Sequence, residues 1–199
     1  MRLVLRTCSL ALVLMATAIL ANADPTYFTT GCFGPACGPG LVAVLPVGGG
    51  NLVYTGQLNQ VLDTSLGFTA AQLGNFTWTG APSGILLNVP FTLQITQTSP
   101  GPIGSNQFLA SLTGVITLNG STGNVNFTSQ SFIINGYRYT LTNLGGPGTG
   151  TGLSLLLNPR GEQTTIQSIV EPVPEPASMV LLGTGLVGVA GYVRRRFRK

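Results

Sequence analysis

Two uncharged apolar runs, one near each end of the chain, limit how much of it can fold as a soluble domain. Leu10–Leu20 is 11 residues long and Ala177–Val193 is 17 residues long. Seven of the nine basic residues lie in the first six and last six positions, and all five acidic residues lie between the two runs. The net charge of +4 therefore belongs to the ends. Nucleic-acid binders need clustered Lys and Arg, and the region between the two runs has only Arg138 and Arg160, so we exclude nucleic acid as a partner.

The first 23 residues have the pattern of a secretory signal peptide. Two arginines within the first six positions are followed by the apolar run, and Ala21 and Ala23 are the small residues of a cleavage site. The run is shorter than the roughly 20 residues of a membrane-spanning helix. We therefore expect residues 1–23 to direct export through the Sec translocon. Signal peptidase would then cut after Ala23, which makes Asp24 the first residue of the mature protein.

Residues 171–199 combine a proline-flanked glutamate, an apolar run and a basic end. The basic cluster consists of Arg194, Arg195, Arg196, Arg198 and Lys199. As a helix, residues 177–193 would extend about 26 Å, which is at the short limit for a bilayer core of about 30 Å. The positive-inside rule keeps the basic cluster, residues 194–199, in the cytoplasm. We therefore expect a transmembrane helix at 177–193, with everything between the two apolar runs translocated.

This C-terminal pattern resembles the PEP-CTERM sorting signal of Gram-negative bacteria. The resemblance rests on the hexapeptide Val173–Ser178, the glycine-containing apolar run and the arginine cluster, about 26 of the 199 residues. It implies that an exosortase, a membrane-embedded cysteine transpeptidase, recognises Pro174, Glu175 and Pro176 and cuts near them. The two prolines keep the backbone extended, which would present the glutamate as an exposed handle. A permanent single-span anchor that retains residues 177–193 is the alternative.

The region between the two ends alternates apolar and polar residues with a period of two. Phe91–Thr98 alternates strictly, and Asn135-Gly136 separates two β-rich runs as in a type I′ hairpin. Strand candidates recur without an amphipathic helix between them. We therefore expect residues 51–170 to form an all-β, antiparallel β-sandwich that is jelly-roll-like. The predicted core contains Trp78, Phe91, Leu93, Ile95, Phe108, Leu112, Ile116, Phe132, Ile134 and Tyr139.

Residues 24–50 form a Gly/Pro-rich N-terminal segment that carries two cysteines. Export brings Cys32 and Cys37 into an oxidising compartment, and Cys8 leaves with the signal peptide. We therefore predict a disulfide between Cys32 and Cys37 that closes a small loop. The chain contains no histidine, and two thiolates alone do not complete a usual tetrahedral zinc site. We predict neither a metal nor a cofactor.

The same lack of histidine removes the usual nucleophilic catalysts. Ser-His-Asp and Cys-His arrangements are impossible, and the region between the two apolar runs has no lysine for a Ser-Lys pair. We therefore predict that the protein is not an enzyme and has no catalytic residue. A hydrolase acting on extracellular glycan is the alternative, since two carboxyl groups can cleave a glycosidic bond. Its candidates are Asp63, Glu162 and Glu171, each of which is more simply a solvated surface carboxylate.

The leading expectation is a structural or adhesive protein. After a transient stage in the inner membrane it would reach the cell surface or the extracellular matrix, and the resemblance implies a link to extracellular polysaccharide and biofilm. An uncharged surface rich in Thr, Asn and Gln can form hydrogen bonds with sugars. A sugar-binding module would need an exposed aromatic platform. Trp78, Tyr137 and Tyr139 are the candidates, although each also fits a packing role.

Overall fold

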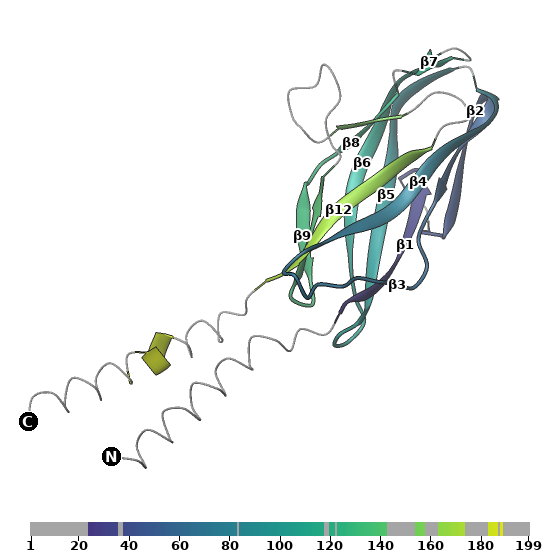
Figure 1. The fold of residues 1–199 in the computed structure, drawn as a ribbon. Helices are drawn as coiled ribbons and strands as arrows, with labels where there is room; N and C mark the ends of the chain where they lie inside the picture. Colours follow the sequence, from purple (N-terminus) through teal and green to yellow (C-terminus); the bar gives the residue numbers. More distant parts are fainter. Residues whose placement is uncertain are drawn as a thin grey trace, which may run out of the picture.

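The protein is built from two antiparallel β-sheets that pack face to face, as the computed structural model shows (Figure 1). The structure describes residues 24–35, 38–82, 84–117, 120–121, 123–142, 154–157, 163–173, 183–186 and 188. The larger sheet has the order β11 (Ser154–Leu156), β8 (Asn124–Phe127), β6 (Gly104–Thr117), β5 (Gly84–Ser99), β1 (Thr26–Phe33) and β3 (Gln60–Val61), and β7 (Gly120–Ser121) pairs with β6. The second sheet has the order β2 (Val42–Thr55), β4 (Thr69–Pro82), β12 (Thr164–Pro172), β10 (Tyr137–Leu141) and β9 (Ser131–Ile134). We call this unit, from Asp24 to Val173, the two-sheet domain.

The period-two pattern places one face of each strand in the core, as the sequence predicts. On β5, Phe91, Leu93 and Ile95 are buried, and the residues between them face outwards. Phe91 lies opposite Ala110 of β6, which is also buried. A one-residue slip of this pairing would move every apolar side chain to the wrong face, so burial fixes the register. The all-β, antiparallel prediction is therefore confirmed for the described residues of the two-sheet domain.

The predicted Asn-Gly hairpin is also confirmed. Strands β9 and β10 pair antiparallel, with Ile134 opposite Tyr137. Asn135 and Gly136 connect them with φ angles of 46° and 79°. Positive φ at both central residues is the geometry of a type I′ turn, whose twist matches that of the flanking strands.

The Gly/Pro-rich segment 24–50, which the sequence analysis set apart from the sandwich, supplies strands to both sheets. β1 lies between β5 and β3 in the larger sheet, and residues 48–50 of β2 pair with β4 in the second. Gly31 is one glycine of this segment that the packing of the two sheets requires. A Cβ at this position would lie 2.6 Å from the ring of Tyr54, so the close approach of β1 and β2 requires glycine.

Aromatic rings from both sheets form the centre of the core. The ring of Phe91 lies 5.2 Å from that of Phe33, 5.2 Å from that of Tyr54 and 5.0 Å from that of Phe76, between ring centroids. These rings come from β1, β2, β4 and β5, and therefore join the two sheets. The predicted core residues Trp78, Phe91, Leu93, Ile95, Phe108, Leu112, Ile134 and Tyr139 are all buried, Phe132 packs partly buried against them, and the side chain of Ile116 lies outside the described set.

Buried hydroxyl groups add hydrogen bonds between the two sheets and, at Tyr54, between the neighbouring strands β2 and β4 of the second sheet. The Thr29 hydroxyl of β1 donates to the Leu73 carbonyl of β4 at 2.8 Å, and the Tyr54 hydroxyl donates to the same carbonyl at 2.7 Å. The Tyr27 hydroxyl donates to the Gln72 carbonyl at 2.7 Å. Each bond gives a polar group inside the domain a hydrogen-bond partner, and a buried polar group without one is costly.

Alkaline pH is expected to unfold the domain through these tyrosines. Burial raises the pKa of Tyr27 to about 12 and raises the pKa values of Tyr54 and Tyr139 further. Because the unfolded side chains ionise near pH 10, their contribution to stability is complete below about pH 10 and is lost as the pH rises through the folded pKa values. Urea midpoints should therefore be level from pH 7 to 9 and fall above pH 10. The chain has five tyrosines, so tyrosinate absorbance at 295 nm equivalent to three or more of them, developing near pH 10 while near-UV circular dichroism is retained, would contradict this assignment.

Candidate functional site

The first and last residues of the two-sheet domain lie at one end of it, as Figure 1 shows for the start of β1 and the end of β12. The Thr64 N–H and hydroxyl donate to the Asp24 carboxylate at 2.9 Å and 3.3 Å. The Val173 N–H donates to the Gly136 carbonyl at 2.7 Å. Tyr137, next to Gly136, forms a side-chain hydrogen bond with Thr64. These contacts connect the beginning of the domain with its end, and we call this region the terminal end.

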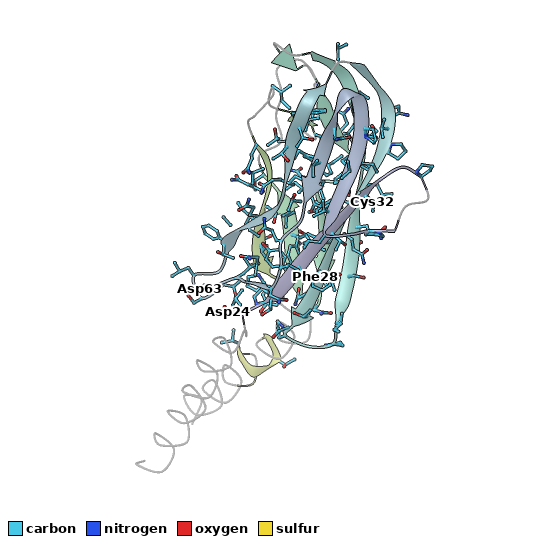
Figure 2. The ribbon with its side chains drawn as sticks, turned by 90° about the vertical axis from the view of Figure 1, so that its right-hand side faces the viewer. Asp24, Phe28, Cys32 and Asp63 are labelled. Carbon is cyan, nitrogen blue, oxygen red and sulfur yellow. The ribbon has the colours of Figure 1, made fainter. Side chains whose placement is uncertain are left out.

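All four charged residues in the described part of the chain belong to the terminal end. Asp63 precedes Thr64, and Figure 2 shows it beside Asp24. Arg138 and Glu171 face each other on β10 and β12, one position before the last pair of these strands, with Nη1 and Oε1 3.0 Å apart. Both side chains are about 40% exposed or more, so this ion pair contributes little to stability. The terminal end therefore has three carboxylates and one guanidinium.

Asp63 and Glu171 each interact with a different neighbouring residue. The pKa of Asp63 is lowered by hydrogen bonds from Ser65, first from its hydroxyl and then from its backbone N–H, which lies 3.0 Å from Oδ1. Glu171 is engaged by Arg138. Burial raises the pKa of Tyr137, and its hydrogen bond with Thr64 offsets part of that rise. Asp63 and Glu171 thus have separate partners, and Glu162, the third candidate of the hydrolase alternative, lies outside the described residues.

The terminal end also has four strongly exposed apolar side chains, which we call the apolar rim. Leu66 is 89% exposed, Ile103 75%, Val61 66% and Phe68 61%, and these are the four highest values among the large apolar side chains that the structure describes. Single exposed apolar residues are common on soluble proteins, whereas several gathered in one place indicate a contact surface.

Main-chain contacts place each member of the apolar rim. Val61 of β3 pairs with the first residue of β1, two positions after Asp24. Leu66 lies in the turn closed by the Gly67 N–H and the Thr64 carbonyl, and Phe68 lies between that turn and β4. Ile103 lies in the β5–β6 turn. There, the side-chain amide of Asn135 donates to the preceding carbonyl, that of Pro102, at 2.7 Å.

The residues that the sequence assigns to export lie mostly outside the described part. This applies to the signal cleavage residues Ala21 and Ala23, to the sorting motif 174–176 and to the basic cluster 194–199. Residues 183–186 and 188 are helical. In the described part of the chain, none of the helical stretches has the length and apolar character needed to cross a bilayer. The predicted transmembrane helix 177–193 is described only in these few residues and stays a prediction.

The predicted disulfide is half inside the described region. Cys32 is buried on β1, where Figure 2 shows it well away from the terminal end, and Cys37 is outside the described residues. Its pairing with Cys32 stays a prediction. Within the ranges that the structure describes, no three His, Cys, Asp or Glu side chains are grouped to hold a metal ion.

The aromatic residues considered for sugar stacking are packing residues. Trp78, Tyr137 and Tyr139 are 6%, 3% and 0% exposed. A sugar can stack only on an exposed ring, so these side chains do not form a platform. The residues that sequence analysis missed are those of the apolar rim. Their only sequence signal is that large apolar residues occur in the turn-rich stretches around Thr64 and Pro102, where polar residues are usual.

Comparison with known proteins locates one motif in the chain. The family model of the PEP-CTERM protein-sorting motif matches residues 172–196. The match begins at Pro172, the last residue of β12, and extends through the Pro-Glu-Pro sequence into the arginine cluster. No curated protein and no solved structure matches the chain.

Proposed function

Because the chain carries a PEP-CTERM protein-sorting motif at residues 172–196, we propose that it is an exported exosortase substrate whose β-domain is delivered to the cell surface. The position of the motif relative to the fold carries this proposal. The last described hydrogen bond of the domain joins the Val173 N–H to the Gly136 carbonyl, and the Pro-Glu-Pro sequence begins at the next residue. A cut near residues 174–176 therefore severs the chain just beyond the fold.

The route to the membrane begins with the signal peptide. Residues 1–23 engage the Sec translocon, and signal peptidase cuts after Ala23. Contacts of the two-sheet domain support this boundary, because Asp24 accepts two hydrogen bonds from Thr64 and β1 begins at Thr26. Cleavage there removes the signal peptide without taking any residue of β1.

The second stage takes place in the inner membrane. Residues 177–193 hold the chain there, with the basic cluster 194–199 on the cytoplasmic side. The exosortase then binds Pro174, Glu175 and Pro176 in their extended conformation and cuts near them. The released domain passes to the cell surface or into the extracellular polysaccharide matrix.

The passenger is a non-enzymatic β-sandwich, jelly-roll-like, with a structural or adhesive role. Its outer face supports this role through uncharged groups. Thr30, Gln94 and Gln107 lie side by side across β1, β5 and β6 and offer hydroxyl and amide groups. Such a surface stays hydrated and can form hydrogen bonds with neighbouring polymers without requiring ions. A glycan hydrolase has less support, because Asp63 and Glu171 each have a separate partner.

Replacing the central residue of the sorting motif tests this proposal. In a host with an active exosortase, Glu175→Ala is expected to reduce the processed form by about tenfold or more, since losing a charge-assisted hydrogen bond costs about 1.5–3 kcal/mol of recognition. The unprocessed chain should collect in the inner membrane. Mass spectrometry of the C-terminus and cell fractionation measure both effects.

Glu171→Ala is the matched control for this experiment. It removes a glutamate only four residues away, from an exposed ion pair outside the motif, and should be processed like the wild type. Normal processing of Glu175→Ala would refute the proposal. Peptides covering residues 194–199 in the surface-exposed protein would refute it as well, because they show a retained anchor.

A further inference from the structure

We infer that the apolar rim contacts the lipid surface while the tail is uncut, so that the two-sheet domain stands on the membrane by its terminal end. The rim consists of Val61, Leu66, Phe68 and Ile103. This inference rests on the membrane stage of the proposed function and adds a lipid-binding surface to it.

The first argument is the length of the connection. Four residue steps separate Val173, the last residue of the domain, from Ala177, the first residue of the uncharged run. Fully extended, they span no more than about 14 Å. The headgroup layer takes up a substantial part of that distance, since it accounts for most of the difference between a core of about 30 Å and a bilayer of about 40–45 Å. The terminal end is therefore held next to the membrane surface.

The second argument is that two connections leave from the same place. Before signal cleavage, Asp24 is joined directly to residues 1–23, and Asp24 lies at the terminal end through its hydrogen bonds with Thr64. The signal peptide and the tail thus both lead from the terminal end towards the membrane. Two connections at one end restrict how far the domain can tilt, and keep that end facing the lipid.

The third argument is the chemistry of the rim itself. Its four members are the most exposed large apolar side chains that the structure describes. They belong to β3, the β3–β4 loop and the β5–β6 turn. Leucine and phenylalanine on the apolar face of interfacial helices lie at the boundary between headgroups and acyl chains, at a depth of about 5–10 Å, and exposed apolar side chains on turns can enter the same layer. Contact with a membrane surface would therefore transfer these side chains from water into an apolar layer.

The charges of the terminal end restrict the kind of lipid. Asp24, Asp63 and Glu171 outnumber Arg138, so this end does not attract an anionic surface. Contact with lipid must come from apolar insertion. Zwitterionic phosphatidylcholine is therefore the appropriate probe, and added anionic lipid is not expected to strengthen the contact.

A fluorescent reporter within the rim tests the inference in the tail-bearing full chain. The chain is reconstituted into phosphatidylcholine vesicles with ordinary or brominated acyl chains, and vesicle flotation checks that it is inserted. The variants F68W and I103W each add one tryptophan at an exposed position. Bromine quenches fluorescence only at close range, so emission from either reporter should fall about twofold at the depth expected for an interfacial contact.

The control reporter is L109W. Leu109 is 52% exposed on β6, in the stretch where β6 pairs with the middle of β5, away from the β5–β6 turn. Its added emission should be unchanged by brominated lipid. Trp78 is buried in the core and contributes the same background to all variants, which the wild-type chain measures.

The outcomes distinguish a failure of the inference from a failure of the proposed function. A chain that floats with the vesicles but shows no more quenching of F68W and I103W than of L109W would overturn the inference and leave the tail insertion intact. A reporter emission that shifts to the blue without bromine quenching, together with dimers in sedimentation, would assign the rim to a second copy of the chain and overturn the lipid contact. A chain that does not float would overturn both the membrane stage and the inference.

Discussion

Replacing Phe91 with alanine is expected to lower the free energy of unfolding by about 3–5 kcal/mol, which is the cost of removing a buried phenylalanine from a core that cannot collapse around the gap. The Phe91 ring is 1% exposed, and its centroid lies 5.0–5.2 Å from three other aromatic rings. These rings come from both sheets, so the cavity would open between the sheets. Urea unfolding followed by tyrosine and tryptophan fluorescence measures the loss.

Leu109→Ala on the neighbouring strand is the control for Phe91→Ala. Leu109 is 52% exposed and faces away from the core, so its truncation should change stability by less than about 0.5 kcal/mol. Equal losses for the two variants would contradict the placement of Phe91 at the centre of the core.

Gly56→Ala is expected to destabilise the domain by about 3 kcal/mol, the upper part of the range for overpacking a tightly packed site. A Cβ at Gly56 would overlap the carbonyl oxygen of Thr29 and lie 2.9 Å from its carbonyl carbon. These are backbone atoms of β1, which is hydrogen-bonded to β5, so they cannot move aside as a side chain could. The Gly56 N–H also donates to the Leu41 carbonyl at 2.7 Å, which fixes the glycine from the other side.

Gly38→Ala is the matched variant, because a Cβ at Gly38 has no atom within 4 Å and the backbone there needs no positive φ. It should leave the urea midpoint unchanged, or raise it slightly by restricting the unfolded chain. A Gly56→Ala protein as stable as the wild type would show that β1 and the end of β2 are less closely packed than described.

The strands that could be predicted are those whose apolar residues strictly alternate. Phe91, Leu93 and Ile95 predict β5 because nothing interrupts their alternation with polar residues. Asn135-Gly136 predicts the β9–β10 hairpin because few other dipeptides tolerate two positive φ angles. In both cases a local rule and the tertiary structure agree. The sorting motif could be predicted for a similar reason, since its order of proline, apolar run and basic cluster is read directly from the sequence.

The strands that could not be predicted depend on partners distant in the chain. β1 contains Gly31, which looks like a loop residue until the ring of Tyr54 is known to lie against it. The apolar rim depends on the fold in the same way. Leu66 and Ile103 are 37 positions apart in the sequence, and only the pairing of the strands between them brings both to the terminal end.

The hydrogen bonds that place Asp24 and Val173 at one end make the domain a replaceable cassette. Under the proposed function, a domain whose beginning and end lie together can be exchanged for another of that kind without changing the distance between the signal peptide and the membrane-spanning run. An exosortase that cuts near residues 174–176 would then act at the same distance from the fold, whichever domain precedes the tail. Selection on the cargo and selection on its delivery can therefore proceed independently.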